Sequence, residues 1–166
     1  MSGKGTLHLF CGKMAAGKST KAAQLADQYG AILLSEDAWL RAIYPQEIQT
    51  FDDYIRYSAR LKPLLKGHVQ NLLRAGLSVV LDFPGNTLDQ RNWFKEIFSE
   101  YGLPHQLHYI KASDALCLSQ LNKRSRGLPE GTAFTTEEAF HQVNRYFQPP
   151  SDEEGFHIQL HATEHT

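Results

Sequence analysis

The feature that most constrains this chain is the segment Gly12-Lys-Met-Ala-Ala-Gly-Lys-Ser19, in which two glycines, a lysine and a serine hold fixed spacings. An apolar run over residues 6–11 precedes it, and an amphipathic run follows it. Glycines allow a tight turn, so that successive backbone N–H groups and the positive end of a helix dipole point at one anion. The pattern therefore predicts a phosphate-binding loop between a buried strand and a helix.

Each fixed residue of this loop has an expected role with ATP and Mg²⁺, the two cofactors that the motif implies. The Lys18 ammonium reaches the β- and γ-phosphates and takes part in catalysis, and the Ser19 hydroxyl binds Mg²⁺. A plain glycine turn with a surface lysine is the alternative, but it does not need lysine and serine in this order. The residues expected around the phosphates are Gly12, Lys13, Met14, Ala15, Ala16, Gly17, Lys18, Ser19 and Thr20.

A second motif, an acid at the end of a predicted strand, supports the interpretation of the glycine loop. The run Leu77-Ser-Val-Val-Leu81 predicts a buried strand, and Asp82 follows it directly. An acid at a strand end is the usual ligand that holds Mg²⁺ beside such a loop, often through water. The alternative is that Asp82 only ends the strand or caps a turn.

Short apolar runs alternate with amphipathic stretches along the chain. They predict buried strands near residues 6–11, 31–34, 77–81 and 106–110 and an edge strand over 156–160. Strands and helices in alternation indicate an α/β fold with a parallel sheet covered on both faces. Pro63 is expected to kink or divide the helical pattern over residues 52–75. We expect one domain over residues 1–166.

The composition of the chain excludes several classes of protein. The 166 residues carry a formal charge of −1 and only two cysteines, which argues against a nonspecific DNA coat, a disulfide scaffold and a four-cysteine zinc site. No apolar run approaches the roughly 20 residues of a membrane helix. We therefore expect a cytoplasmic protein with no membrane partner, and leave open whether it is a monomer or a dimer.

The acceptor side of the reaction is expected just past the second strand, at Ser35-Glu36-Asp37. Residues after the carboxyl ends of parallel strands line the ligand crevice. A carboxylate there would orient an attacking hydroxyl and accept its proton, and we favour Asp37 over Glu36 for this role. The alternative is helix capping by Ser35 or Asp37 with acidic first-turn residues.

Arginines are candidates for binding phosphate or substrate, because guanidinium groups match the oxygens of a transferring phosphoryl group. Arg124 and Arg126 lie at a cationic helix end that runs into a glycine- and proline-containing loop. This pattern predicts a lid over about residues 124–135, with both arginines catalytic and Arg124 also at ATP. Helix-dipole placement is the alternative for this pair. Arg41 and Arg91 are the substrate-binding candidates, with a solvated helix face as the alternative for Arg91.

Together, the loop, the Ser-x-Asp step with Arg41 and Tyr44-Pro45 behind it, and the arginine-bearing lid resemble the small P-loop kinases. The nearest group contains zeta toxins, polynucleotide 5′-hydroxyl kinases, chloramphenicol phosphotransferase and AAA-type predicted kinases, over Leu7 to about Phe147. The resemblance implies a three-layer α/β/α sandwich with strand order 2-3-1-4-5. It also implies transfer from Mg-ATP to a hydroxyl of a small molecule or nucleotide-like acceptor, with Asp37 as base.

Several alternatives remain. Asp82-Phe-Pro-Gly85 and Asn122-Lys123 resemble GTPase motifs, but the carboxylate that would bind guanine is missing. A regulatory or toxin-like ATP-binding module without small-molecule transfer is a second alternative. A 5′-hydroxyl nucleic-acid kinase is a third. Both the near-neutral charge and an Asp37–Arg41 spacing one residue longer than in polynucleotide kinases disfavour it.

Three residue classes have less specific patterns. The histidines at 157, 161 and 165 are spaced by four, but on an alternating strand they need not converge on a metal. Cys11 is expected to be a small apolar filler in a buried strand. The aromatic residues that either pack in the core or floor an acceptor pocket are Trp39, Tyr44, Phe51, Tyr54 and Tyr57.

Overall fold

The computed structural model of the chain describes residues 3–13, 15–125 and 137–163, the side chains of residues 124, 125 and 163 excepted. Its strands are β1 (Leu7–Cys11), β2 (Ile32–Ser35), β3 (Val79–Asp82), β4 (His105–Ala112) and β5 (Ile158–Thr163). Its helices are α1 (Lys18–Tyr29), α2 (Glu36–Ile43), α3 (Phe51–Arg74), α4 (Leu88–Ser99), α5 (Asp114–Ser125) and α6 (Glu137–Asn144), with a short 3₁₀ turn at Asp152–Glu154.

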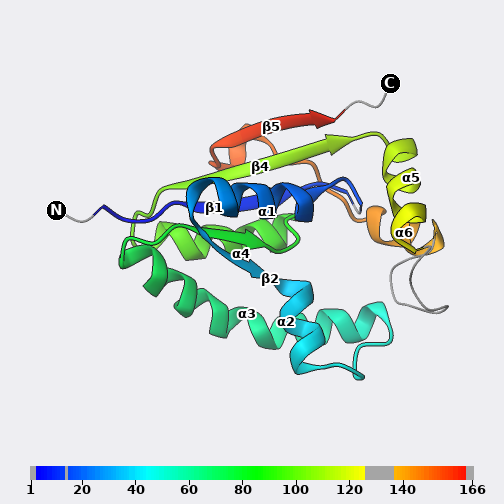
Figure 1. The fold of residues 1–166 in the computed structure, drawn as a ribbon, viewed down its shortest axis with the longest axis horizontal. Coiled ribbons are helices and arrows are strands. Elements are labelled where there is room, and N and C mark those ends of the chain that lie inside the picture. Colours follow the sequence, from blue (N-terminus) through cyan, green and yellow to red (C-terminus); the bar gives the residue numbers. More distant parts are fainter. Residues whose placement is uncertain (1–2, 14, 126–136, 164–166) are drawn as a thin grey trace.

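The strands form one parallel sheet in the order β2-β3-β1-β4-β5 (Figure 1). This confirms the α/β class and the strand order that the family resemblance implies. The central strand, β1, is buried at every residue, which explains why its sequence is apolar apart from His8. The alternating strand predicted near the chain's end is β5, which lies at the sheet edge two residues later than expected.

Two apolar clusters cover the two faces of the sheet. Leu7 and Leu9 of β1 pack in a cluster with residues of α3 and α4, whereas Phe10 points to the other face and packs in a cluster with residues of α1, α5 and α6. Figure 1 shows α1 in front of the sheet and α4 behind it. The alternation of side chains along β1 thus builds the predicted three-layer sandwich.

Local signals fix several helix ends. Gly30 ends α1 in the left-handed conformation, which favours glycine. At the start of α4, the Thr87 side chain accepts a hydrogen bond from the Gln90 backbone N–H at 3.1 Å. The helix α3 continues through Pro63, so of the two expected effects, a kink or a division, this proline does not cause the division. None of the helices in the described part of the chain combines the length and the apolar character needed to cross a bilayer.

A row of histidines crosses the sheet from β1 to β5. His8 Nδ1 lies 3.0 Å from His108 Nε2, and His108 Nδ1 lies 2.9 Å from His161 Nε2. Each contact needs one N–H donor and one lone pair, so neutral rings satisfy the row. Burial lowers the pKa of all three rings, that of His108 to about 3, where the charges of His8, His161 and Lys21 act in the same direction.

We therefore expect acid to destabilise the fold through this row. Because the pKa of His108 is about 3 in the folded chain and 6.5 ordinarily, stability is fully present above pH 6.5 and is lost as the pH falls below it. The loss is about 1.4 kcal/mol per pH unit for each proton that only the unfolded chain binds. Urea unfolding at pH 7.5, 6 and 5 measures it.

The matched control is His68→Gln, since His68 is exposed on α3. This variant should keep the pH dependence of the wild type. A free energy of unfolding that stays constant from pH 7.5 to 5 would contradict a neutral histidine row.

Candidate functional site

The loop between β1 and α1 has the backbone geometry that the glycine spacing predicts. Gly17 is the N-cap of α1 with φ of 108°, a conformation that favours glycine. A Cβ on Gly12 would lie 2.7 Å from the carbonyl oxygen of Ile110, so a side chain there meets the backbone of β4. The first turn of α1 carries no acidic residue, and its N-terminal amides therefore favour an external anion.

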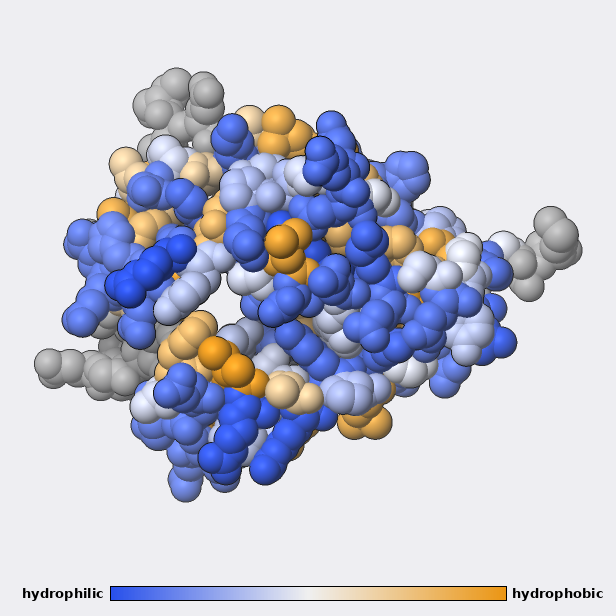
Figure 2. Space-filling view, turned by 180° about the vertical axis from the view of Figure 1, so that it is seen from behind, coloured by the Kyte–Doolittle hydropathy of each residue, from blue (hydrophilic) through white to orange (hydrophobic). Residues whose placement is uncertain are grey.

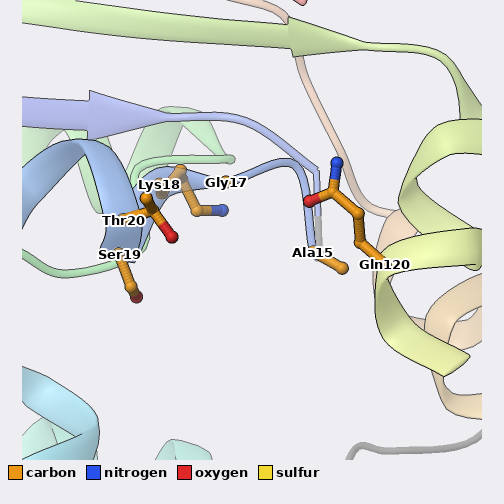
Figure 3. Close-up of a pocket in the computed structure, with 6 residues that line it drawn as sticks. All are labelled: Ala15, Gly17, Lys18, Ser19, Thr20 and Gln120. Atoms are coloured by element: carbon orange, nitrogen blue, oxygen red, sulfur yellow. The ribbon is translucent and has the colours of Figure 1, made fainter. Parts of the chain in front are cut away.

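Lys18 and its neighbours surround a small pocket beside this loop. The Lys18 ammonium donates a hydrogen bond to the carbonyl oxygen of Gly12, which folds the side chain back along the loop. Figure 3 shows Lys18 and Thr20 at the start of α1 and Gln120 facing the loop from α5. The pocket has a volume of about 100 Å³ and is lined by Ala15, Gly17, Lys18, Ser19, Thr20 and Gln120.

The hydroxyl of Ser19 donates a hydrogen bond of 2.8 Å to Asp82 Oδ2. The structure thus brings together the two residues that the sequence predicted as metal ligands. A hydroxyl and a carboxylate oxygen are hard donors of the kind that Mg²⁺ prefers, so the pair fits that ion. Burial raises the pKa of Asp82, and the negative charge of Asp37 adds to this, while the Ser19 hydrogen bond and Lys18 act against it.

The register of β2 against β3 places the acceptor-side carboxylate at the same edge. Ser35 of β2 lies directly opposite Asp82 of β3, and Asp37 follows Ser35 by two residues in the first turn of α2. The Asp37 side chain is 79% exposed and forms an ion pair of 3.1 Å with Arg41, one helical turn away. Asp37 and Arg41 thus stand together in solvent, near the Ser19–Asp82 pair.

Ser35 and Glu36 have different surroundings from Asp37. The Ser35 side chain caps α2 by accepting a hydrogen bond from the Ala38 N–H at 3.3 Å, which is the capping role weighed for it. Glu36 is buried and binds the hydroxyl groups of Tyr54 and Ser58 on α3. Only Asp37 of the two predicted carboxylates is therefore open to a substrate.

The surface of the molecule has an opening near α2. Figure 2 shows an opening between the part of the molecule that contains α2 and the start of α3 and the part that carries the sheet. Four of the five predicted aromatic residues pack against the core, namely Trp39, Tyr44, Tyr54 and Tyr57, and the rings of Tyr44 and Tyr57 lie 4.3 Å apart. This packing agrees with the core interpretation of the aromatic residues, with Tyr54 additionally bound to Glu36.

The prediction that Arg91 binds substrate is corrected by its burial. The Arg91 side chain is 0% exposed and forms an ion pair with Glu154, Nε to Oε1 at 2.7 Å. It also donates to the carbonyl oxygens of Gly85 and Pro149 at 2.9 and 3.4 Å. The helix-face pattern did not reveal this, because Glu154 and Pro149 lie far away in the sequence.

The remaining predicted residues fall into two groups, those that the structure describes and those outside the described residues. Lys13 forms an ion pair of 2.9 Å with Asp114 at the start of α5, and Ala16 is buried in the loop. Arg124 belongs to α5, but its side chain is outside the described part of the chain. Met14, Arg126 and the expected lid beyond residue 125 also lie outside the described residues.

Two residues at the site were not predicted. Asn86 Oδ1 accepts a hydrogen bond of 2.9 Å from the Gly12 N–H, and the Asn86 N–H donates to Gln90 Oε1 at 2.7 Å. Its position shortly after Asp82, past the end of β3, is the signal that could have identified it. Gln120 lines the pocket from α5, and nothing in its local sequence marks it.

The model of an AAA domain family, AAA_33, matches residues 7–150 of the chain. The match spans the loop, Asp37 and Asp82. The chain belongs to the AAA_33 family. No match was found among curated proteins.

Solved structures share the fold of this AAA_33 chain. The crystal structure of APE1195 is 25% identical, with a TM-score of 0.65, and the match covers 95% of this chain and 86% of that one. A Chloroflexus aurantiacus protein is 18% identical, with a TM-score of 0.73 and coverage of 96% and 86%. The Mycobacterium tuberculosis APS kinase CysC, in complex with AMPPNP and APS, is 15% identical, with a TM-score of 0.66 and coverage of 99% and 91%. The fold of the AAA_33 chain is therefore that of the P-loop kinases.

We expect Arg91→Leu to destabilise this AAA_33 protein by about 3–5 kcal/mol, because it removes the charged partner of the Glu154 carboxylate and the donor to two carbonyl oxygens. Lys66→Met is the control, since the side chains of its ion pair with Glu100 are 25% and 45% exposed, and it should cost less than about 1 kcal/mol. Urea unfolding at pH 7.5 compares the two. Equal losses in both variants would contradict the structural role of Arg91.

Proposed function

We propose that the protein is an ATP-dependent phosphotransferase that moves the γ-phosphoryl group of Mg-ATP to a hydroxyl of a small molecule or nucleotide-like acceptor. The observation that carries the proposal is the 2.8 Å contact between Ser19 and Asp82 beside the glycine loop, with an exposed carboxylate, Asp37, at the same sheet edge. An APS kinase of the same fold binds AMPPNP and APS, which supports a nucleotide donor and a separate acceptor.

The donor half of the site holds the phosphates. The backbone amides of residues 15–19 and the N-terminal end of α1 bind the phosphate oxygens. Lys18 moves from the Gly12 carbonyl oxygen to the β- and γ-phosphates, where its charge stabilises the negative oxygens. Ser19 and Asp82 would hold Mg²⁺, which would supply positive charge to the phosphate oxygens.

The acceptor half delivers the hydroxyl. Asp37 accepts the proton of the acceptor hydroxyl while the hydroxyl oxygen forms a bond to the γ-phosphorus. The bond from that phosphorus to the β–γ bridging oxygen breaks, and ADP is released. Arg41 holds the Asp37 carboxylate through their ion pair. Arg124 and Arg126 of the proposed lid supply positive charge to the transferring group.

An acceptor screen tests this function directly. The purified chain is incubated with Mg-ATP and, one at a time, nucleosides, 5′-hydroxyl oligonucleotides, nucleotide sugars and amino-alcohol antibiotics. ADP release is coupled to mass spectrometry of the acceptor. We expect one class to gain the mass of a phosphoryl group in step with ADP release. Steady ADP release with no modified acceptor would identify an ATPase instead and overturn the proposal.

We expect Asp37→Asn to lower kcat by about 10²–10⁴-fold with the acceptor found in the screen, because the amide cannot take the proton. The affinity for ATP should stay within about twofold, since Asp37 serves the acceptor. Loss of the exposed ion pair with Arg41 should cost less than about 1 kcal/mol of stability. Steady-state kinetics, ATP titration and urea unfolding measure the three effects.

Asp89→Asn is the matched control for Asp37→Asn. Asp89 is also an exposed acid in the first turn of a helix that follows a strand, in this case α4. Its kcat should equal that of the wild type. A normal kcat in Asp37→Asn would remove the base from the mechanism.

A further inference from the structure

A buried carboxylate stands directly beside the proposed base. Glu36 occupies the first turn of α2 next to Asp37, yet only 4% of the residue is exposed. Ser58 Oγ donates to Glu36 Oε2 at 2.6 Å, and the Tyr54 hydroxyl donates to Oε1. Each oxygen of this carboxylate therefore accepts a hydrogen bond from α3, and neither is available to an acceptor hydroxyl.

The surface of α3 that binds Glu36 is a continuous helical stripe. Tyr54, Ser58 and Lys62 follow one another at intervals of four residues, so they lie on one face of the helix. The charge of Lys62 favours the ionised form of Glu36, although burial has the larger effect and raises the pKa of the carboxyl. Two hydroxyl donors and a nearby ammonium thus offset the free-energy cost of burying one carboxylate.

The helix that carries Asp37 depends on such contacts. With eight residues, Glu36–Ile43, α2 is shorter than the roughly 12 residues that an isolated helix needs in water. Leu40 packs in the core, but Asp37 and Arg41 are on the exposed side. At the start of the helix, the Glu36 side chain forms hydrogen bonds that tie the first turn to α3.

We infer that Glu36 is a positioning residue for phosphoryl transfer. By binding Tyr54 and Ser58, it fixes the first turn of α2 against α3 and keeps Asp37 beside Asp82 and the transferring group. The inference rests on the proposed function and assigns a residue to it. Transfer is sensitive to such positioning, because the acceptor oxygen must align with the γ-phosphorus.

The test compares four variants for kcat, KM of the acceptor and affinity for ATP. Glu36→Gln keeps the size of the side chain but leaves one acceptor oxygen, and Ser58→Ala removes one donor. Their combination reports whether both act through the same contact. Gln70→Leu is the control: this buried residue of α3 donates to the Ile97 carbonyl oxygen at 3.1 Å, on the side of α4 rather than α2.

We expect Glu36→Gln to lower kcat at least tenfold and Ser58→Ala to lower it less, with ATP affinity within twofold of the wild type in both. The loss of kcat in the double variant should be smaller than the product of the two single losses, because both side chains act through the same contact. Gln70→Leu should lower the midpoint of urea unfolding and leave kcat within twofold.

The outcomes separate the two proposals. A wild-type chain that modifies no acceptor overturns the proposed function and this inference with it. A wild-type chain that transfers phosphate, with normal kcat in Glu36→Gln and in Ser58→Ala, overturns the inference alone. The inference also fails if Gln70→Leu lowers kcat as much as they do, or if both variants lose kcat only in proportion to ATP affinity.

Discussion

The site depends first on the hydrogen bond between Ser19 and Asp82. This bond links the first turn of α1 to the end of β3, and so holds the glycine loop against the neighbouring strand. Parallel strands end at the same edge of a sheet, so the ends of β1, β2 and β3 bring the loop, Asp37 and Asp82 together without any long connection. The order of the strands therefore places these side chains close together.

A scaffold of polar contacts supports the loop from the side away from solvent. Asn86 binds the Gly12 N–H, and Arg91 binds the Gly85 carbonyl oxygen just before it. Glu154 completes the scaffold by pairing with Arg91 in the segment that leads to β5. The loop therefore depends on residues that touch no phosphate, and its shape is fixed by the whole sheet rather than by glycine alone.

The sequence predicted the parts of the structure that depend on interactions between residues close together in the chain. The glycine loop, the glycine end of α1 and the buried β1 each follow from short patterns, and the strand order followed from the family resemblance. Long-range partners decided the rest. A helix-face pattern cannot show that Arg91 meets Glu154, which lies 63 residues away, or that Glu36 turns inward to Ser58, which lies 22 residues away. The single helix through Pro63 likewise reflects packing of α3 along the sheet and α4.

The most direct measurement is a calorimetric titration of the chain with ATP, in Mg²⁺ and in EDTA, for the wild type and for Lys18→Ala. We expect one ATP per wild-type chain, with weaker binding in EDTA, and no detectable binding to a Lys18→Ala variant that still unfolds cooperatively. Equal ATP affinity in the two proteins, or no ATP binding by the wild type, would contradict a phosphate site built from the loop, Lys18 and the Ser19–Asp82 pair.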